Sequence, residues 1–310
     1  MRSLVALALL PLAAWSADQL GKAAPTRHVH LACADSSRLS LDPATPMQGA
    51  VFHVRLSSAP AGAQLSGQIA GQALHFVPER DGGAVSLAAT PIDGERSVEV
   101  TVHCMQGEIV DTLSLRVQLA RGDYPVERLR VAPGFGREPD SALAARIGRE
   151  SAKAREVAEI SHTTPRLWHE EWQLPRTSRI TSGFGRGREF NGTITSRHMG
   201  TDFAGATGSP VRAANRGVVR IVDAFYYGGN VVYLDHGDGL TSAYLHLSRQ
   251  DVAPGDTVER GETIGVVGAT GRVTGPHLHL IMRYGTVTVD PMSLFAIAGD
   301  SSAKRAARAP

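Results

Sequence analysis

Lysine, cysteine and net charge are all scarce in this sequence. The 310 residues include three lysines (Lys22, Lys153 and Lys304) and two cysteines (Cys33 and Cys104), and the formal net charge is +2. A charge this small argues neither for nor against a nucleic-acid partner, and we predict none. Both cysteines lie far from the histidine pair described below, so we do not expect a zinc site with cysteine ligands.

Long hydrophobic segments are also missing. The longest apolar run, Leu4 to Ala14, is shorter than the ~20 residues that a membrane-spanning helix needs. It follows Arg2 and ends at Ala14-Trp15-Ser16, which is the pattern of a secretory signal peptide over residues 1–17. We therefore expect export to the periplasm or the extracellular space, without stable membrane insertion after signal cleavage. An uncleaved anchor is the alternative.

An even number of cysteines in an exported chain predicts a disulfide bond. Here that bond would join Cys33 and Cys104, which both lie in stretches with strand character. Closing a loop of this length would stabilise the fold by roughly 4 kcal/mol. Two free thiols are the less favoured alternative.

The N-terminal half has the pattern of short β-strands. Val98 to Cys104 and Leu113 to Leu119 alternate apolar and polar residues, and turn sequences such as Asp81-Gly82-Gly83 separate runs of this kind. Residues 27–120 are therefore predicted to form a β-sandwich-like accessory domain. No catalytic group of residues is visible in it.

The remaining chain divides into a connector, a second β domain and a tail. The connector covers residues 121–172, and Asp140 can cap a helix predicted over residues 140–161. From residue 173 to residue 298 glycines are dense and strands are short, which predicts an antiparallel β domain. The small, basic tail, 299–310, is expected to be disordered. The fold class is thus mainly β, with two β domains joined by a helical connector and a monomeric state.

Two histidines alternate with two leucines in the stretch Gly275 to Leu280. In a strand, residues two apart share a face, so His277 and His279 would project together while the leucines enter a core. The pair could supply two metal ligands, or one ligand and one catalytic base. Two structural histidines on a strand are an equally good explanation of this motif alone.

Further histidines and a carboxylate decide between these explanations. His198 and Asp202 lie four residues apart with Gly200 between them, and His246 lies in a strand-like stretch. Together with the histidine pair they supply three ligands and two further imidazoles. Catalytic zinc sites use three protein ligands, and the ion lowers the pKa of its bound water towards neutrality. The two other histidines could then serve as a base and as donors to the transition state.

This arrangement of motifs resembles the M23 metallopeptidases, the LytM/lysostaphin-type endopeptidases. The motifs are His198-x-x-x-Asp202, Tyr244-x-His246 and His277-x-His279, supported by Ser182-x-Phe184-Gly185 and similar glycine-rich stretches. The resemblance covers about residues 178–295. It implies an antiparallel β metallopeptidase domain that holds Zn²⁺ and hydrolyses peptide cross-links or stems of peptidoglycan.

The resemblance also implies a role for each matching residue. The metal ligands would be His198, Asp202 and His279, and the catalytic histidines would be His246 and His277. Some LytM-like proteins have lost ligands and only activate other cell-wall hydrolases. A catalytically silent activator is therefore the alternative function, although no ligand is missing here.

A second partial resemblance is excluded by the scarcity of lysine. Val252 to Val258 and Gly261 to Gly265 look like one half of a biotinyl or lipoyl carrier domain, which needs a lysine at a hairpin tip. The chain has no lysine between Lys153 and Lys304. Whether the accessory domain targets the enzyme to the cell wall or covers its groove is left open by the sequence.

Overall fold

The computed structural model describes residues 37–135, 138–192 and 194–308. The predicted signal peptide, Cys33 and the first ten residues of the predicted accessory domain lie outside these ranges. The disulfide between Cys33 and Cys104 therefore stays a prediction. Cys104 itself is fully buried, and no free cysteine occurs among the described residues.

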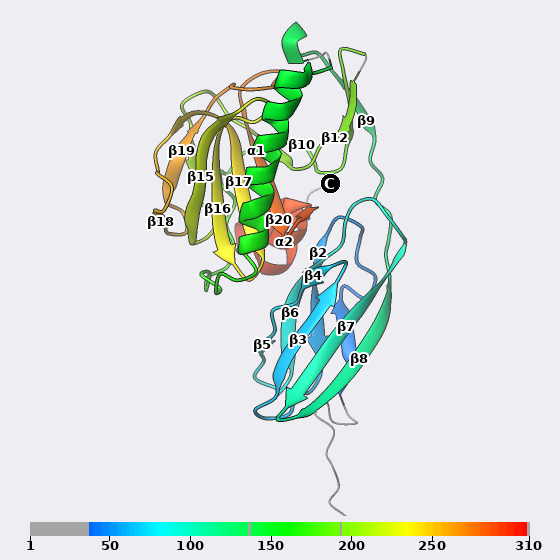
Figure 1. Ribbon diagram of the computed structural model, residues 1–310. Coiled ribbons are helices and arrows are strands. Elements are labelled where there is room, and N and C mark those ends of the chain that lie inside the picture. Colours follow the sequence, from blue (N-terminus) through cyan, green and yellow to red (C-terminus); the bar gives the residue numbers. More distant parts are fainter. Residues whose placement is uncertain (1–36, 136–137, 193, 309–310) are drawn as a thin grey trace, which may run out of the picture. The chain divides into compact units, whose positions relative to one another are not determined.

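The N-terminal β domain contains two four-stranded antiparallel sheets (Figure 1). The first has the order β1 (Leu39–Asp42), β2 (Val51–Leu56), β6 (Ala84–Ala89) and β5 (Val77–Pro78). The second has the order β4 (Gln72–Ala73), β3 (Gln64–Ile69), β7 (Ser97–Gln106) and β8 (Ile109–Gln118). Strand β7 shows why the sequence folds this way, because Val100, Val102 and Cys104 are buried while the residues between them are not. Apolar residues from both sheets, including Phe52 and Val102, form one core.

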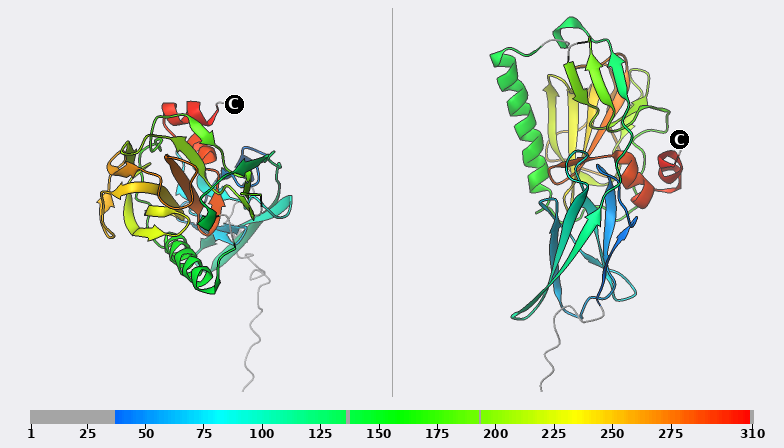
Figure 2. Two further views of the ribbon diagram at one scale, coloured as in Figure 1. Left: turned by 90° about the horizontal axis from the view of Figure 1, so that it is seen from above. Right: turned by 90° about the vertical axis from the view of Figure 1, so that its right-hand side faces the viewer.

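The connector contains a strand, a short helix and a long helix. These are β9 (Val126–Leu129), the 3₁₀ helix η1 (Pro133–Phe135) and α1 (Ser141–Ile160). The Asp140 carboxylate accepts a hydrogen bond from the Leu143 amide and so caps α1. Helix α1 buries Ala154 and Val157 against strands of the second β domain, and Figures 1 and 2 show the helix lying along that sheet.

The C-terminal β domain is built on a ten-stranded antiparallel sheet. The continuous order is β10 (Ile180–Ser182), β13 (Thr201–Ala204), β20 (His277–Tyr284), β17 (Leu240–Gln250), β16 (Gly229–Gly237), β15 (Gly217–Phe225) and β18 (Thr257–Val258). Strand β19 (Thr263–Val267) pairs with β17 and with β14 (Pro210–Arg212), and β21 (Val287–Val289) pairs with β20. Two β domains and a helical connector confirm the predicted mainly β fold.

A separate three-stranded sheet brings the connector to the C-terminal domain. Strand β11 (Gly187–Phe190) pairs antiparallel with β12 (Ile194–Arg197) and parallel with β9 of the connector. Glu127 of β9 is thereby aligned with Arg188 of β11. This pairing places connector residues beside the candidate site.

The C-terminal segment corrects one expectation. Helix α2 (Pro291–Ala298) is followed by α3 (Ser301–Ala307), whereas residues 299–310 were expected to be disordered. Asp300 caps α3 by accepting hydrogen bonds from the amides of Ser302 and Ala303, and it pairs with Arg260 at 2.8 Å. The Ala303 side chain is fully buried. The cap and this buried contact outweigh the polar composition of the tail.

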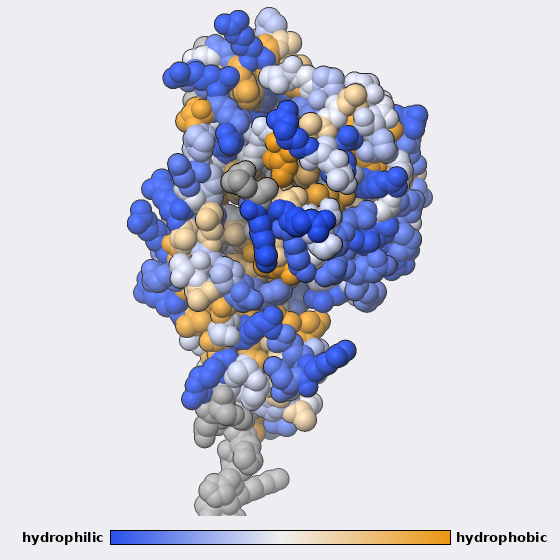
Figure 3. Space-filling view, turned by 180° about the vertical axis from the view of Figure 1, so that it is seen from behind, coloured by the Kyte–Doolittle hydropathy of each residue, from blue (hydrophilic) through white to orange (hydrophobic). Residues whose placement is uncertain are grey.

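The described surface seen in Figure 3 is mostly hydrophilic, with hydrophobic side chains scattered among charged ones. Within the described ranges, no helix combines the length and the apolar character needed to cross a bilayer.

Candidate active site

The site is assembled where β13 pairs with β20. In this antiparallel pair Asp202 lies opposite His279, and Ala204 lies opposite His277. Leu278 and Leu280 are fully buried in the core, as the alternation along β20 predicts. The strand register therefore brings a carboxylate and an imidazole together although 77 residues separate them in the sequence.

Three potential ligand atoms converge at this point. His198 Nε2 lies 3.0 Å from Asp202 Oδ1 and 2.9 Å from His279 Nδ1, and the last two atoms are 2.7 Å apart. All three side chains are buried. His198, Asp202 and His279 are the three residues predicted as ligands, and among the described residues they form the one group of this kind.

The tautomer of His198 follows from the contact that its Nδ1 nitrogen makes. Nδ1 lies 2.7 Å from the Gly183 carbonyl oxygen, which accepts only from an N–H, so Nδ1 carries the proton. Its Nε2 then presents a lone pair towards the Asp202 oxygen. Electron-pair donors that face one another at this distance are stabilised by a cation between them, and the carbonyl contact is the usual orienting partner of a metal-binding histidine.

Gly200 provides the space that His279 needs. A Cβ atom at this position would lie 2.4 Å from the Leu280 carbonyl oxygen and 2.7 Å from His279 Nε2. Both contacts are shorter than real Cβ contacts, so any larger residue would displace the strand or the ring. The glycine between His198 and Asp202 is thus required by close approach of β20.

Arg188 holds the second oxygen of Asp202. Its Nη2 donates to Asp202 Oδ2 at 2.6 Å, which leaves Oδ1 directed at the two imidazoles. Burial opposes ionisation of Asp202, but the interactions with the neighbouring His198 and His279 rings outweigh it and hold the pKa of the carboxyl well below its usual range. Asp202 is therefore an anion at neutral pH.

The two predicted catalytic histidines lie beside this group. His246 Nδ1 donates to the Thr270 carbonyl oxygen at 2.8 Å, and His277 Nδ1 donates to the Gly275 carbonyl oxygen at 2.8 Å. In the neutral form of each ring, Nε2 then carries the lone pair. The ring centroids are 4.9 Å apart, and His277 Nε2 is 3.6 Å from Asp202 Oδ1.

Burial keeps His246 neutral. Desolvation, followed by the nearby His279 and His277, lowers the pKa of His246 well below its usual value. Its backbone has a φ of 63°, an uncommon conformation for a residue with a side chain. Local strain at this position is consistent with a functional role.

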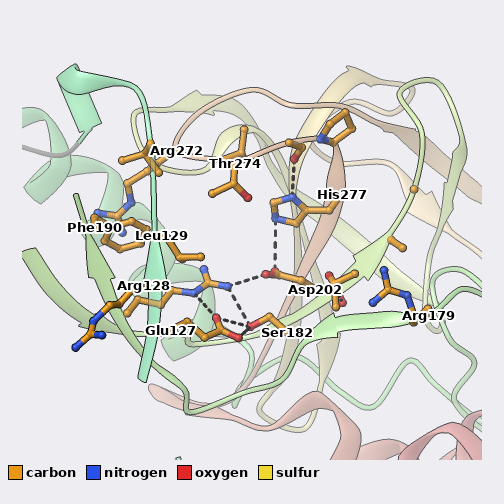
Figure 4. A pocket seen from close by; sticks show the side chains of 18 residues that line it. Glu127, Arg128, Leu129, Arg179, Ser182, Phe190, Asp202, Arg272, Thr274 and His277 are labelled. Atoms are coloured by element: carbon orange, nitrogen blue, oxygen red, sulfur yellow. Dashed lines mark hydrogen bonds and ion pairs between the residues drawn. The ribbon is translucent and has the colours of Figure 1, made fainter. Parts of the chain in front are cut away.

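The connector adds Glu127 to the site, a residue that the sequence reasoning missed. Ser182 Oγ lies 3.1 and 3.0 Å from the two carboxylate oxygens of Glu127, and Arg188 Nε lies 3.6 Å from one of them. Glu127 and Arg188 line a cavity of about 620 Å³ together with Asp202 and His277 (Figure 4). Nothing in the sequence spacing links Glu127 to the histidines, because a parallel strand pair brings it there.

The sequence comparisons now identify the domain. The protein-family model that matches residues 196–291 is that of peptidase family M23. Residues 196–291 are an M23 peptidase domain. All five histidine and aspartate residues of the site fall within this M23 range.

The curated relatives of the M23 domain include two from Vibrio cholerae. Peptidoglycan DD-endopeptidase ShyC is 48% identical over 82 residues, which cover 26% of this chain and 19% of that protein. Peptidoglycan DD-endopeptidase ShyA is 50% identical over 88 residues, which cover 28% and 20% respectively. The matched part of the chain thus spans about a fifth of the length of these relatives.

A solved structure resembles a larger part of the chain. The crystal structure of an M23 peptidase from Pseudomonas aeruginosa covers 81% of this chain and 95% of its own, with a TM-score of 0.62 and 24% identity. At this identity the likeness concerns the fold. The likeness in fold thus extends beyond the M23 domain of this chain.

Proposed function

We propose that the protein is an exported zinc-dependent endopeptidase that hydrolyses peptide cross-links or stems of peptidoglycan. The observation that carries this proposal is the convergence of His198, Asp202 and His279 beside two imidazoles with available lone pairs. The M23 family match and the peptidoglycan DD-endopeptidases among the relatives support the reaction and the substrate class.

The three converging side chains fit Zn²⁺. Two imidazole nitrogens and one carboxylate oxygen are a ligand set found in catalytic zinc sites, and Arg188 and Gly183 orient the ligands. When bound there, the ion would polarise a peptide carbonyl and make water acidic enough to ionise near neutral pH.

His246 and His277 supply proton transfer and hydrogen bonding. Each ring is fixed by a backbone carbonyl, so its Nε2 is held in one direction at the edge of the ligand group. A neutral His246 can accept a proton, and the protonated ring can return that proton to a leaving amine. His277 lines the large cavity and so is placed to contact a bound peptide.

Loss of His279 tests the proposal. Purified sacculi would be incubated with the full chain, with the His279→Ala variant and with a surface control, Arg249→Gln, whose side chain is exposed. We expect soluble fragments from the wild type and the control, identified by mass spectrometry as cut peptide cross-links or stems, and none from His279→Ala.

The same assay separates the proposal from an activator function. If the zinc-loaded wild type released no fragments but increased release by an added cell-wall hydrolase, the activator function would replace the proposal. Equal release by the wild type and His279→Ala would show that the assigned site does not perform the hydrolysis.

A further inference from the structure

Arg272 is a cation of the active-site cavity for which the described residues provide no ionic partner. It lies in the loop between β19 and β20, and its side chain is mostly buried. Within the described part of the chain, its guanidinium makes neither a hydrogen bond nor an ion pair. Two of the other arginines that line this cavity are paired, Arg188 with Asp202 and Arg128 with Glu189.

Two aromatic rings hold the Arg272 guanidinium in place. Its Cζ lies 4.1 Å from the ring centroid of Phe190 and 4.1 Å from that of Tyr227. Such stacking contacts use the π face of the guanidinium. The N–H donors lie in its plane and remain free for a planar acceptor, and a carboxylate matches them with two parallel hydrogen bonds.

The loop that carries Arg272 is fixed relative to the catalytic histidine. The Arg272 amide donates to the Tyr227 carbonyl oxygen at 2.9 Å, and two residues earlier the Thr270 carbonyl accepts from His246. Gly271 has a φ of 74°, and a Cβ there would lie 2.3 Å from the Gly229 amide nitrogen. Arg272 is thus held at a defined place with respect to His246.

An anion bound to Arg272 would lie next to the candidate ligands and the two catalytic histidines. Arg272 lines the cavity of about 620 Å³ with Asp202 and His277, and also a smaller one of about 150 Å³ with His246 and His279. Figure 4 shows it beside Phe190, at the side of the large cavity away from Arg179. The large cavity is lined by four arginines and two carboxylates, so an acidic ligand suits it.

We propose that Arg272 is a specificity-determining residue that binds a free carboxylate of the peptide substrate close to the scissile bond. The proposal rests on the endopeptidase function above and defines its substrate as an acidic peptide. Arg272 is partly buried, and this burial lowers its pKa. An incoming carboxylate would therefore meet a cation that the Phe190 and Tyr227 rings already hold in one orientation.

Two matched substrates test the proposal. One is a synthetic cross-linked stem peptide with free carboxylates, and the other is the same peptide with those carboxylates converted to carboxamides. A charge-assisted hydrogen-bond pair gives a preference of roughly 10- to 100-fold, so the wild type should show this ratio of kcat/KM for acid over amide. Arg272→Gln should lower kcat/KM for the acid and so reduce the ratio to about 1.

The remaining variants make the result decisive. Arg272→Lys keeps the positive charge but loses the planar pair of N–H donors. Its acid-over-amide ratio of kcat/KM should therefore lie between those of the wild type and Arg272→Gln. Arg249→Gln, an exposed arginine outside both cavities, should behave as the wild type. A wild-type ratio near 1, or an unchanged ratio in folded Arg272→Gln, would overturn the proposal.

Calorimetric binding of both peptides to the full chain separates this proposal from the endopeptidase function. Tighter binding of the acid without any cleavage would uphold the role of Arg272 and reject the hydrolysis. Cleavage of both peptides with equal binding would uphold the hydrolysis and reject the role of Arg272.

Discussion

Replacing Gly200 with alanine should damage both the fold and the proposed metal site. The added Cβ would lie 2.4 Å from the Leu280 carbonyl oxygen and 2.7 Å from two atoms of the His279 ring. Because the oxygen belongs to the backbone of β20, it cannot move away as a flexible side chain would. Overpacking of this kind costs ~1–3 kcal/mol, and a backbone clash points to the upper end, about 3 kcal/mol.

The clash also acts on the proposed ligands. Thr201 pairs with Leu280 and Asp202 with His279, so moving β20 away from β13 separates the two ligands that this register joins. We therefore expect Gly200→Ala to hold less zinc than the wild type at the same free zinc concentration. Denaturant unfolding measures the stability change, and elemental analysis of dialysed protein measures the zinc.

Gly183→Ala is the matched control. Gly183 also lies at the site, where its carbonyl holds His198, but a Cβ there would meet no atom within 4 Å. Its free energy of unfolding should stay within about 0.5 kcal/mol of the wild type. If Gly200→Ala matched this control in both stability and zinc content, the close approach of β20 would not be what positions the ligands.

Three further outcomes are expected. His246→Ala should keep its zinc but lose ~10²- to 10⁴-fold in kcat; zinc loss would make His246 a ligand instead. A chelator should abolish hydrolysis of sacculi and added Zn²⁺ should restore it, whereas activity that survives chelation would exclude a metal role. Burial lowers the pKa of His236 to about 4, so between pH 6.5 and pH 4 the unfolded chain binds a proton that the folded chain does not. Unfolding free energy should therefore fall by up to ~3 kcal/mol as the pH drops through that window, measured by denaturation, and less so in His236→Gln.

Local patterns predicted the parts of the fold that depend on neighbours in the sequence. Strand β20 follows from the alternation of His277 to Leu280, and α1 follows from the Asp140 cap and its apolar spacing. The family resemblance, more than spacing, assigned the ligand roles. The mutual distances of His198, Asp202 and His279 depend on the register of β13 and β20, which a single sequence does not display.

The features that were missed involve long-range contacts or weak local signals. Glu127 reaches the site only because β9 adds to β11, and Arg272 depends on aromatic rings from two other segments. Helix α3 had a visible signal, since Asp300 can cap it and Lys304 and Arg305 suit its last turn. The small, polar composition of the tail outweighed that signal in the sequence reasoning.

A zinc titration of metal-free protein tests the central claim most directly. Zinc would be added in fractions of one equivalent while fragments released from sacculi and bound zinc are measured together. If His198, Asp202 and His279 hold one catalytic ion, hydrolysis should rise in proportion to bound zinc and level off at one ion per chain. Full hydrolysis by the metal-free protein, or zinc bound without any gain in hydrolysis, would contradict the account.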